Sequence, residues 1–188
     1  MTAVWIVLGV IALLVIAGVV SYNRFVNQRN LIRNAWANID TELQRRYDLI
    51  PNLVETVKGY AAHERETLDA VTQARAGAVA QHGTPAEQAA AEGPLVGALR
   101  QLFAVAENYP DLKANQNFLQ LQQELAVTED RLQASRRFYN ANVQDYNTRV
   151  QSFPSNLIAR WFDFTEQEFF EIEAALRDEV KRPPKVEF

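Results

Sequence analysis

The sequence contains no cysteine, which excludes disulfides, thiol catalysis and cysteine-bound zinc. Histidine is also scarce, with only His63 and His82 in 188 residues. Neither histidine follows a glutamate by three residues, as a carboxylate-bridged two-metal bundle requires, and His-Glu-x-x-His is absent. We interpret His63-Glu64 as a polar surface pair, and the sequence predicts no enzyme activity, catalytic residue, metal site or cofactor.

Glycine and proline are scarce, at 7 each, and cluster in a few places. Good helix formers dominate instead, and the alternation of apolar and polar residues that marks a β-strand is hard to find. The composition therefore predicts an all-α protein of one domain plus an anchor. An excess of positive charge is lacking too: the net charge is −4, which argues against nucleic acid as a partner.

One long hydrophobic run lies near the N-terminus. Ala3 to Val20 is 18 residues without a polar or charged side chain, and as a helix it extends about 27 Å, close to the hydrocarbon thickness of a bilayer. A signal peptide would have a positive charge before a shorter apolar stretch and a small-x-small cleavage site after it, and none of these is present. We expect residues 1–21 to be a retained single-pass transmembrane anchor that contacts the lipid bilayer through residues 3–20.

The charges beside this anchor predict its direction. Arg24, Arg29 and Arg33 follow the anchor, whereas no lysine or arginine precedes it. The positive-inside rule then places the N-terminus outside and the following domain in the cytoplasm. A domain that faces the periplasm is the alternative.

A long helix at about residues 22–80 is predicted after the anchor. Its apolar positions recur with a period of 3.6 residues and keep their phase across Pro51, which favours a single helix with a proline kink. In the alternative, Asp48 caps a new helix and Pro51 lies in its first turn. The predicted core positions are Phe25, Ile32, Trp36, Ile39, Leu43, Tyr47, Ile50, Val54, Val57, Ala61, Leu68 and Val71.

Five asparagines on this helix form what we call the asparagine stripe. At about 100° per residue they fall within about 80° of one another, opposite the apolar positions. Because asparagine is a poor former of helix interiors, the stripe is either a solvated face or a contact surface for another copy or a partner helix. Its members are Asn23, Asn27, Asn30, Asn34 and Asn38.

The remaining chain predicts three more helices, and proline and glycine mark the boundaries between them. If successive helices alternate in direction, residues 22–180 form a bundle of four helices. The expected helices span about residues 85–108, 115–153 and 165–180, and residues 181–188 form a tail.

Two of these helix starts carry a capping box. Thr84, Pro85 and Glu87 occupy the N-cap, N1 and N3 positions before the helix at about residue 85. Thr165 and Glu168 have the same spacing before the last predicted helix.

The helix at about residues 115–153 has an apolar seam with heptad spacing, which predicts a coiled-coil-like partner helix. Polar groups recur every seven residues along it, and two tyrosines lie one heptad apart. Buried polar groups on a seam cost stability unless they are hydrogen-bonded, and their best-attested role is to fix register; alternatively, they lie at its edge. The candidate polar seam is Thr128, Ser135, Tyr139, Asn142 and Tyr146.

An aromatic cluster follows this seam, and its place depends on topology. With one kinked helix at residues 22–80, the chain runs away from the membrane, back, away and back, so the cluster caps the core at the distal end. With a hairpin at Pro51, the cluster returns to the bilayer, where Trp161 beside Arg160 is an interface anchor. We expect the core cap, because the apolar phase favours the kink. The cluster contains Phe153, Trp161, Phe162, Phe164, Phe169 and Phe170.

Several long motifs resemble the LemA family, and they occur in the same order over roughly residues 22–170. The motifs are RRYDLIPNLVETVKGYAAHE, ENYPDLKANQNFLQLQQEL, TEDRLQASRRFYNANVQDYN and SFPSNL. The resemblance implies a bacterial inner-membrane protein with an N-terminal anchor, an elongated up-and-down, antiparallel four-helix bundle and no known enzymatic activity. Relatives among magnetosome proteins are linked to forming internal membranes, which implies a scaffold or membrane-organising role. Many relatives look like lipoproteins that face the periplasm, but that anchor requires a cysteine, which this chain lacks.

The leading hypothesis is a membrane-anchored, non-enzymatic scaffold or adaptor. It acts by helix–helix contact, either as a homo-oligomer or with a partner membrane protein, and it includes a role in membrane organisation. The alternative is a module of the cell envelope that binds a partner or peptide in a groove near Pro51 or beside Tyr139 and Tyr146. A metal-cofactor bundle or an enzyme is the least favoured hypothesis, because the required motifs are missing.

Overall fold

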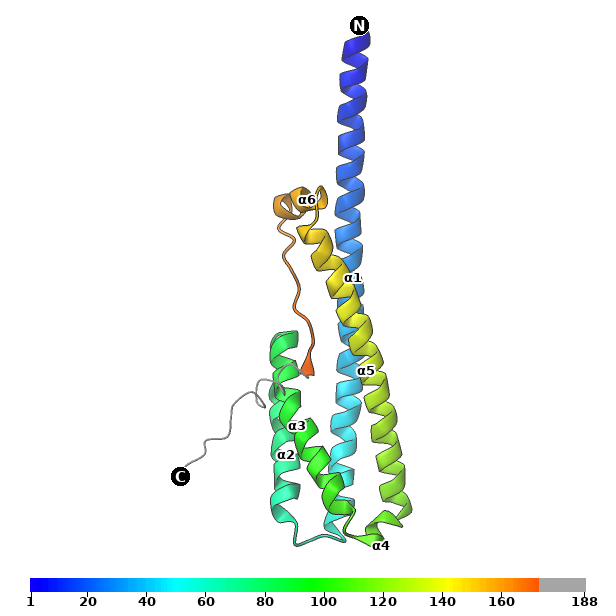
Figure 1. Ribbon diagram of the computed structural model, residues 1–188, viewed down its shortest axis with the longest axis vertical. Coiled ribbons are helices and arrows are strands. Elements are labelled where there is room, and N and C mark those ends of the chain that lie inside the picture. Colours follow the sequence, from blue (N-terminus) through cyan, green and yellow to red (C-terminus); the bar gives the residue numbers. More distant parts are fainter. Residues whose placement is uncertain (173–188) are drawn as a thin grey trace, which may run out of the picture. The chain divides into compact units, whose positions relative to one another are not determined.

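The computed structural model describes residues 1–172, and its long elements are all α-helices (Figure 1). The predicted all-α class is confirmed: a long N-terminal helix with an apolar first third is followed by helices that pack antiparallel. The elements are α1 (Thr2–Lys58), α2 (Arg65–Ala80), α3 (Pro85–Ala106), α4 (Pro110–Lys113), α5 (Gln116–Gln151) and α6 (Ser155–Trp161).

Pro51 lies inside α1, so the chain forms one helix there and Asp48 does not cap a new one. A proline in a helix interior costs about 3 kcal/mol and leaves the carbonyl four residues earlier without its amide partner. That carbonyl belongs to Tyr47, and the Arg75 Nε of α2 donates a hydrogen bond to it at 2.7 Å. The neighbouring helix thus supplies the donor that the proline removes.

The prediction of one helix over residues 22–80 is wrong, because α1 ends at Lys58 and α2 begins at Arg65. The chain turns at residues 59–64, which start with Gly59, a poor helix former. Side chains from the α3–α5 connection hold this turn: Tyr109 donates to Glu64 at 2.9 Å, and Asn115 donates to the Tyr60 hydroxyl at 2.8 Å. The apolar periodicity that continues past residue 58 therefore belongs to two separate helices, α1 before the turn and α2 after it.

The chain divides into two compact units. Residues 1–37 and 137–167 form what we call the anchor unit, and residues 38–136 and 168–172 form the bundle unit. In the bundle unit, α2 and α3 lie side by side and antiparallel (Figure 1). The end of α1 and the start of α5 complete its set of four long helical segments.

The core of the anchor unit is aromatic. The ring of Phe25 stacks on Phe164 at a centroid distance of 4.8 Å and meets Tyr146 edge-on at 5.9 Å. Trp36 packs on Tyr139 at 5.5 Å. Such ring pairs contribute beyond the area they bury, and here they join α1 to α5 and to the chain that follows α6.

The two predicted capping boxes have different outcomes. The first is confirmed: the Glu87 amide donates to the Thr84 hydroxyl at 3.4 Å, and the Thr84 amide donates to the Glu87 carboxylate at 2.8 Å. The second forms no helix, since residues 164–171 have no regular secondary structure. The rest of the helix expected at about residues 165–180, and the tail at residues 181–188, lie outside the described residues.

Tertiary contacts explain why the second box does not start a helix. Asn147 of α5 donates from its side-chain amide to the Gln167 carbonyl and accepts from the Gln167 amide, both at 2.8 Å. Gln151 also donates to Glu166 at 2.9 Å. These bonds hold the segment in an extended form along α5 (Figure 1), and the backbone amide and carbonyl of Gln167 are engaged there instead of in a helix.

The expectation that the aromatic cluster caps a distal core is wrong for the first three of its residues, Phe153, Trp161 and Phe162. The additional reversal at residues 59–64 brings the end of α5 back to the N-terminal part of α1 in the anchor unit. Phe164 and Phe170 are buried, but three members are largely exposed to the outside: Phe153, Trp161 and Phe162.

Candidate interaction surfaces

The apolar run at residues 3–20 is the start of α1 and packs against almost nothing. Its large hydrophobic side chains are all exposed, and Gly18 is its one half-buried residue. By length and composition, α1 is the one described helix that could cross a membrane. The N-terminal third of α1 is therefore consistent with a membrane anchor, as the sequence predicts.

The asparagine stripe begins immediately after this run. All five members are exposed: Asn23, Asn27, Asn30, Asn34 and Asn38. The opposite face of α1 is closed, because Phe25, Ile32 and Ile39 are each at most 5 % exposed. The stripe is thus a continuous polar face that no described part of the chain covers.

The three arginines that follow the anchor do not share one environment. Arg24 and Arg33 are exposed, whereas Arg29 is half-buried with its guanidinium carbon 5.5 Å from the centroid of the Phe164 ring. A cation over an aromatic face is stabilised by the ring quadrupole. Arg29 therefore also belongs to the packing of the anchor unit.

The candidate polar seam divides into buried and half-buried positions. Thr128 is buried and its hydroxyl donates to the Glu124 carbonyl at 2.8 Å, while Asn142 is half-buried and donates to the Phe138 carbonyl at 2.7 Å. Both bonds lie within α5, so they satisfy the polar groups without linking α5 to another helix. Ser135 is half-buried, and a register role for these groups stays a prediction.

The two seam tyrosines are core residues of the anchor unit. Tyr139 and Tyr146 are 2 % and 1 % exposed, in contact with Trp36 and Phe25 respectively. Burial raises the pKa of the Tyr146 phenol, and the positive charge of Arg29 lowers it by a smaller amount. Neither ring presents a surface that a partner could reach.

A buried polar cluster in the bundle unit was missed by the sequence analysis, and we call it the polar clamp. Arg46 of α1 forms an ion pair with Glu92 of α3 and a second one with Glu129 of α5, at 3.2 Å. The Tyr47 hydroxyl also donates to Glu92. Gln88 donates to the Tyr47 hydroxyl at 3.1 Å and to Glu92 at 3.0 Å.

The polar clamp contacts all four long helical segments of the bundle unit. Gln88 also donates to the Ala78 carbonyl of α2 at 3.2 Å, so α2 joins α1, α3 and α5. The side chains of Arg46 and Glu92 are 2 % and 0 % exposed, whereas Glu129 at 41 % reaches solvent. Burial, and then the hydrogen bond to Glu92, raise the pKa of the Tyr47 phenol. Charges this deeply buried must be paired, because an unpaired charge in a low dielectric is strongly destabilising.

The sequence held a signal for the polar clamp. Leu43, Arg46, Tyr47 and Ile50 have the i, i+3, i+4, i+7 spacing of one helix face, so a charged residue lies inside the apolar arc. A charge in that position needs a buried partner. Gln88 and Glu92, one turn apart beside small residues, are the corresponding polar pair. The sequence alone could not identify which acidic residue pairs with Arg46, because several acidic residues lie at suitable positions on the other predicted helices.

The bundle unit also has an open groove between α1 and α5, of about 510 Å³. Its lining residue Leu49 is two positions before Pro51, and one hypothesis from the sequence placed a binding groove near that proline. Charged and amide side chains dominate its lining, together with two apolar ones: Arg45, Leu49, Gln120, Gln123, Glu124, Val127, Thr128 and Arg131.

Metal binding finds no support in the described residues, which contain no group of three or more histidine or acidic side chains placed to hold an ion. His63 is exposed in the turn after α1, and Glu64 is half-buried with Tyr109 as its hydrogen-bond donor. The pair therefore lies in a turn and not on a helix.

Comparison with known proteins decides the family. The model of the LemA family matches residues 35–188, which covers both the end of α1 with Arg46 and the whole of α5. The chain belongs to the LemA family. The match includes the polar clamp and the whole polar seam, and it begins after four of the five members of the asparagine stripe.

The chain also resembles individual proteins over much of its length. The chain is similar to protein LemA of Metamycoplasma hominis, with 29 % identity over 161 residues, or 84 % of this chain and 72 % of that protein. It is also similar to magnetosome protein MamQ 2 of Paramagnetospirillum magneticum, with 27 % identity over 175 residues. Magnetosome protein MamQ of Magnetospirillum gryphiswaldense is 25 % identical over 174 residues. The matched region spans 64 % of the length of each of these two MamQ proteins.

Proposed function

We propose that this chain is a membrane-anchored, non-enzymatic scaffold or adaptor that works through helix–helix contacts of the asparagine stripe. Its partner is a second copy of the chain or another membrane protein. The observation that carries the proposal is the exposure of all five asparagines on a helix whose opposite face is buried. Similarity to magnetosome proteins supports a role in membrane organisation.

Amide side chains suit such a contact, because each can donate and accept hydrogen bonds across a helix–helix interface. The stripe begins three residues after the apolar run ends at Val20. Two anchored copies are confined to the same plane, so their stripes meet at a high effective concentration and weak contacts suffice.

The proposed location is the inner membrane of a bacterial cell, with the N-terminus outside and the bundle unit in the cytoplasm. Arg24 and Arg33 support this direction, because they are exposed just after the apolar run. A membrane-impermeant maleimide tests it on intact cells that make the Asn34→Cys variant. Labelling only after lysis is expected, and labelling before lysis would place the bundle unit in the periplasm.

Cross-linking tests the contact itself. The chain has no cysteine, so Asn34→Cys in the full-length protein gives a single thiol, and a short bis-maleimide is applied to intact membranes. We expect a strong dimer band if the stripe meets its own copy. The matched control is Asp40→Cys, which is also exposed on α1 but lies about 120° around the helix.

Equal dimer bands from both variants would indicate random collision and contradict self-association. The absence of a dimer band from Asn34→Cys would also contradict it, and a discrete heterologous adduct at Asn34 alone would instead support the partner form of the proposal.

The groove between α1 and α5 favours a second candidate function, the binding of an extended partner segment. Its mixed charges and two apolar residues resemble a peptide-binding surface more than a small-molecule pocket. A photoreactive residue at Gln123, inside the groove, should capture a peptide partner, whereas one at the exposed Ala126 of the same helix should not. Equal capture at both positions would contradict this function.

A further inference from the structure

We propose that α6 makes a second contact with the membrane, in which Phe153, Leu157, Trp161 and Phe162 lie in the lipid headgroup interface beside the transmembrane helix. We call these four side chains the interfacial patch. The contact concerns lipid and does not depend on the asparagine stripe, so either proposal can fail without the other.

The interfacial patch is the densest exposed apolar surface that the described chain shows outside the anchor. Phe153, Leu157, Trp161 and Phe162 are 78 %, 55 %, 83 % and 51 % exposed within ten residues. The other exposed large apolar side chains after residue 20 are scattered singly over the helices. Single exposed apolar residues are normal on a protein surface, whereas a concentrated patch marks a surface that something covers.

Contacts with α1 fix the level of α6 relative to the end of the apolar run. A Cβ atom added at Gly18 would lie 3.8 Å from Ile158 Cδ1, which is ordinary packing distance. The Tyr22 and Phe162 rings have a centroid distance of 4.8 Å. Since the apolar run ends at Val20 and a helix rises about 1.5 Å per residue, both contacts lie within about 3 Å of that end. This is the depth at which the hydrocarbon core gives way to headgroups.

The turn after α6 holds it at this level. Asp163 takes the left-handed conformation, with φ of 58°, and the Phe164 amide donates to the Ala159 carbonyl at 2.9 Å. That bond is the long-range one of a Schellman motif, which ends a helix and redirects the chain. Phe164 then stacks on Phe25 of α1, so α6 is packed on α1 both at Ile158 and directly after its last residue.

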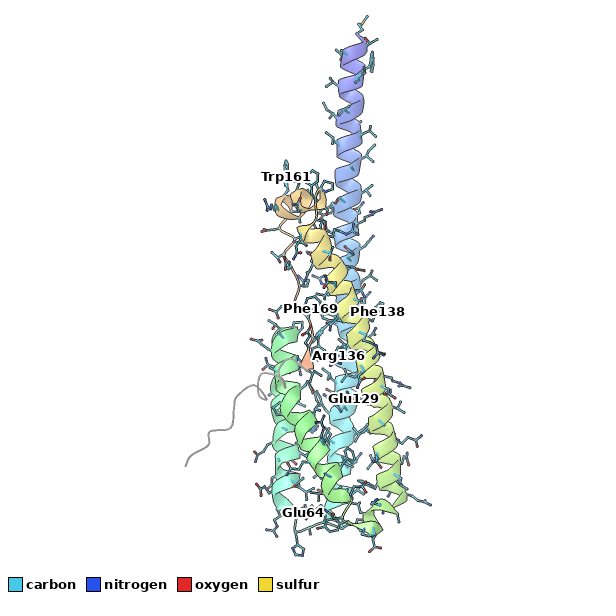
Figure 2. The ribbon with its side chains drawn as sticks, viewed as in Figure 1. Glu64, Glu129, Arg136, Phe138, Trp161 and Phe169 are labelled. Atoms are coloured by element: carbon cyan, nitrogen blue, oxygen red, sulfur yellow. The ribbon has the colours of Figure 1, made fainter. Side chains whose placement is uncertain are left out.

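The faces of α6 divide as an interfacial helix requires. Ala159 is buried and Ile158 is half-buried against α1, whereas Leu157 and Trp161, one turn apart, share the exposed face. In Figure 2 the Trp161 side chain projects from α6 toward the apolar end of α1. The surface of α6 is thereby continuous with the lipid-facing surface of the anchor.

The chemistry of the patch favours lipid over a protein partner. Tryptophan is enriched where hydrocarbon meets headgroups, since its ring is apolar and its N–H is polar. Arg160 is exposed beside Trp161, where it can reach lipid phosphates. A second copy could cover the patch only by entering the layer that already surrounds the anchor.

Nitroxide accessibility in vesicles tests the contact with the full-length protein. The variants Trp161→Cys and Leu157→Cys each give one labelled site, because the chain has no other cysteine. The probes are oxygen, which partitions into lipid, and a nickel chelate, which stays in water, with vesicles of phosphatidylcholine and phosphatidylglycerol. We expect both labels to be relaxed strongly by oxygen and several-fold less by nickel than a label in water.

The matched control is Phe138→Cys. Phe138 is 53 % exposed and belongs to the same unit, but it lies on α5 well away from α6 (Figure 2). Its label should be relaxed strongly by nickel. Leu157→Cys keeps Trp161, so it reports the contact even if the tryptophan is needed for it.

Two results would overturn the proposal. Nickel accessibility at residues 157 and 161 equal to that at residue 138 would place α6 in water. Protection of both labels from oxygen and nickel together would mean that protein, and not lipid, covers the patch.

Discussion

The interiors of the anchor unit and the bundle unit are built from different kinds of side chain. The bundle unit closes its interior around paired charges, with Arg46 and Glu92 almost completely excluded from solvent. The anchor unit packs aromatic rings, such as Phe25 on Phe164, and leaves its apolar anchor and the interfacial patch exposed. The interior of the bundle unit thus contains paired charges, whereas the anchor unit combines an aromatic interior with large apolar surfaces that no described part of the chain covers.

This difference shows where each unit gets its specificity. Ring packing tolerates small shifts, because dispersion and burial depend weakly on direction. A buried ion pair does not tolerate shifts, since a charge that loses its partner in a low dielectric costs several kcal/mol. We infer that the polar clamp fixes one arrangement of the four bundle segments, whereas the anchor unit is held by aromatic packing between α1, α5 and the chain after α6.

The largest expected effect comes from breaking the polar clamp. Glu92→Gln removes a fully buried charge and leaves Arg46 with only the partly exposed Glu129. We expect a loss of about 3 kcal/mol or more in the free energy of unfolding, measured by guanidinium unfolding of the detergent-solubilised protein with circular dichroism.

Glu107→Gln is the control for this loss, because it removes an exposed ion pair with Lys113 and should change the free energy of unfolding by less than about 1 kcal/mol. Equal losses of unfolding free energy from the two variants would show that the polar clamp stabilises the protein no more than an exposed ion pair does. The proposed difference between the two units would then be contradicted.

A slightly smaller effect is expected from the aromatic core of the anchor unit. Tyr146→Ala deletes a ring that is 1 % exposed and touches Phe25, so it should cost about 3 kcal/mol. Phe138→Ala, on the exposed side of the same helix, should change stability by less than about 0.5 kcal/mol.

Hydrogen exchange should also separate the two units. Tyr146→Ala should accelerate exchange mainly at the end of α5, whereas Glu92→Gln should do so mainly in α3. Acceleration spread evenly over both units for either variant would mean that they unfold as one.

The smallest expected effect compares the two capping motifs. Thr84→Ala removes a formed N-cap at the start of α3 and should cost about 1 kcal/mol. Thr165→Ala changes the same motif where no helix begins, so the loss should stay below about 0.5 kcal/mol. Thermal unfolding measured by circular dichroism is sufficient. A larger loss at Thr165 than at Thr84 would contradict the extended form of the segment after α6.

Local sequence patterns predicted much of this fold. The anchor, the helix through Pro51, the start of α3 at Thr84 and the long α5 all follow from periodicity and capping, which act within a few residues of chain. The asparagine stripe was found for the same reason. Its function stays a prediction, because a face can be recognised without the partner that covers it.

Other features depended on residues far apart in the sequence. The reversal at residues 59–64 was missed because the apolar periodicity of α2 continues that of α1. The side chains that hold this turn, Tyr109 and Asn115, lie 45 and 55 residues further along the sequence than the residues they bind, where local patterns do not reveal them. That error moved the aromatic cluster to the wrong end of the predicted bundle. The Thr165 box failed because Asn147 binds the backbone of the same segment.

The sequence by itself determined which stretches are helical, which faces are apolar and that the N-terminal run can span a bilayer, since these depend on spacing along one chain. Only the tertiary structure decided which acids neutralise Arg46, which donor satisfies the carbonyl freed by Pro51 and where α6 lies against α1. In each case the local sequence is compatible with several partners, so it does not identify the one that is used. They are made by burial, because a charge or carbonyl withdrawn from water needs a partner at hydrogen-bond distance.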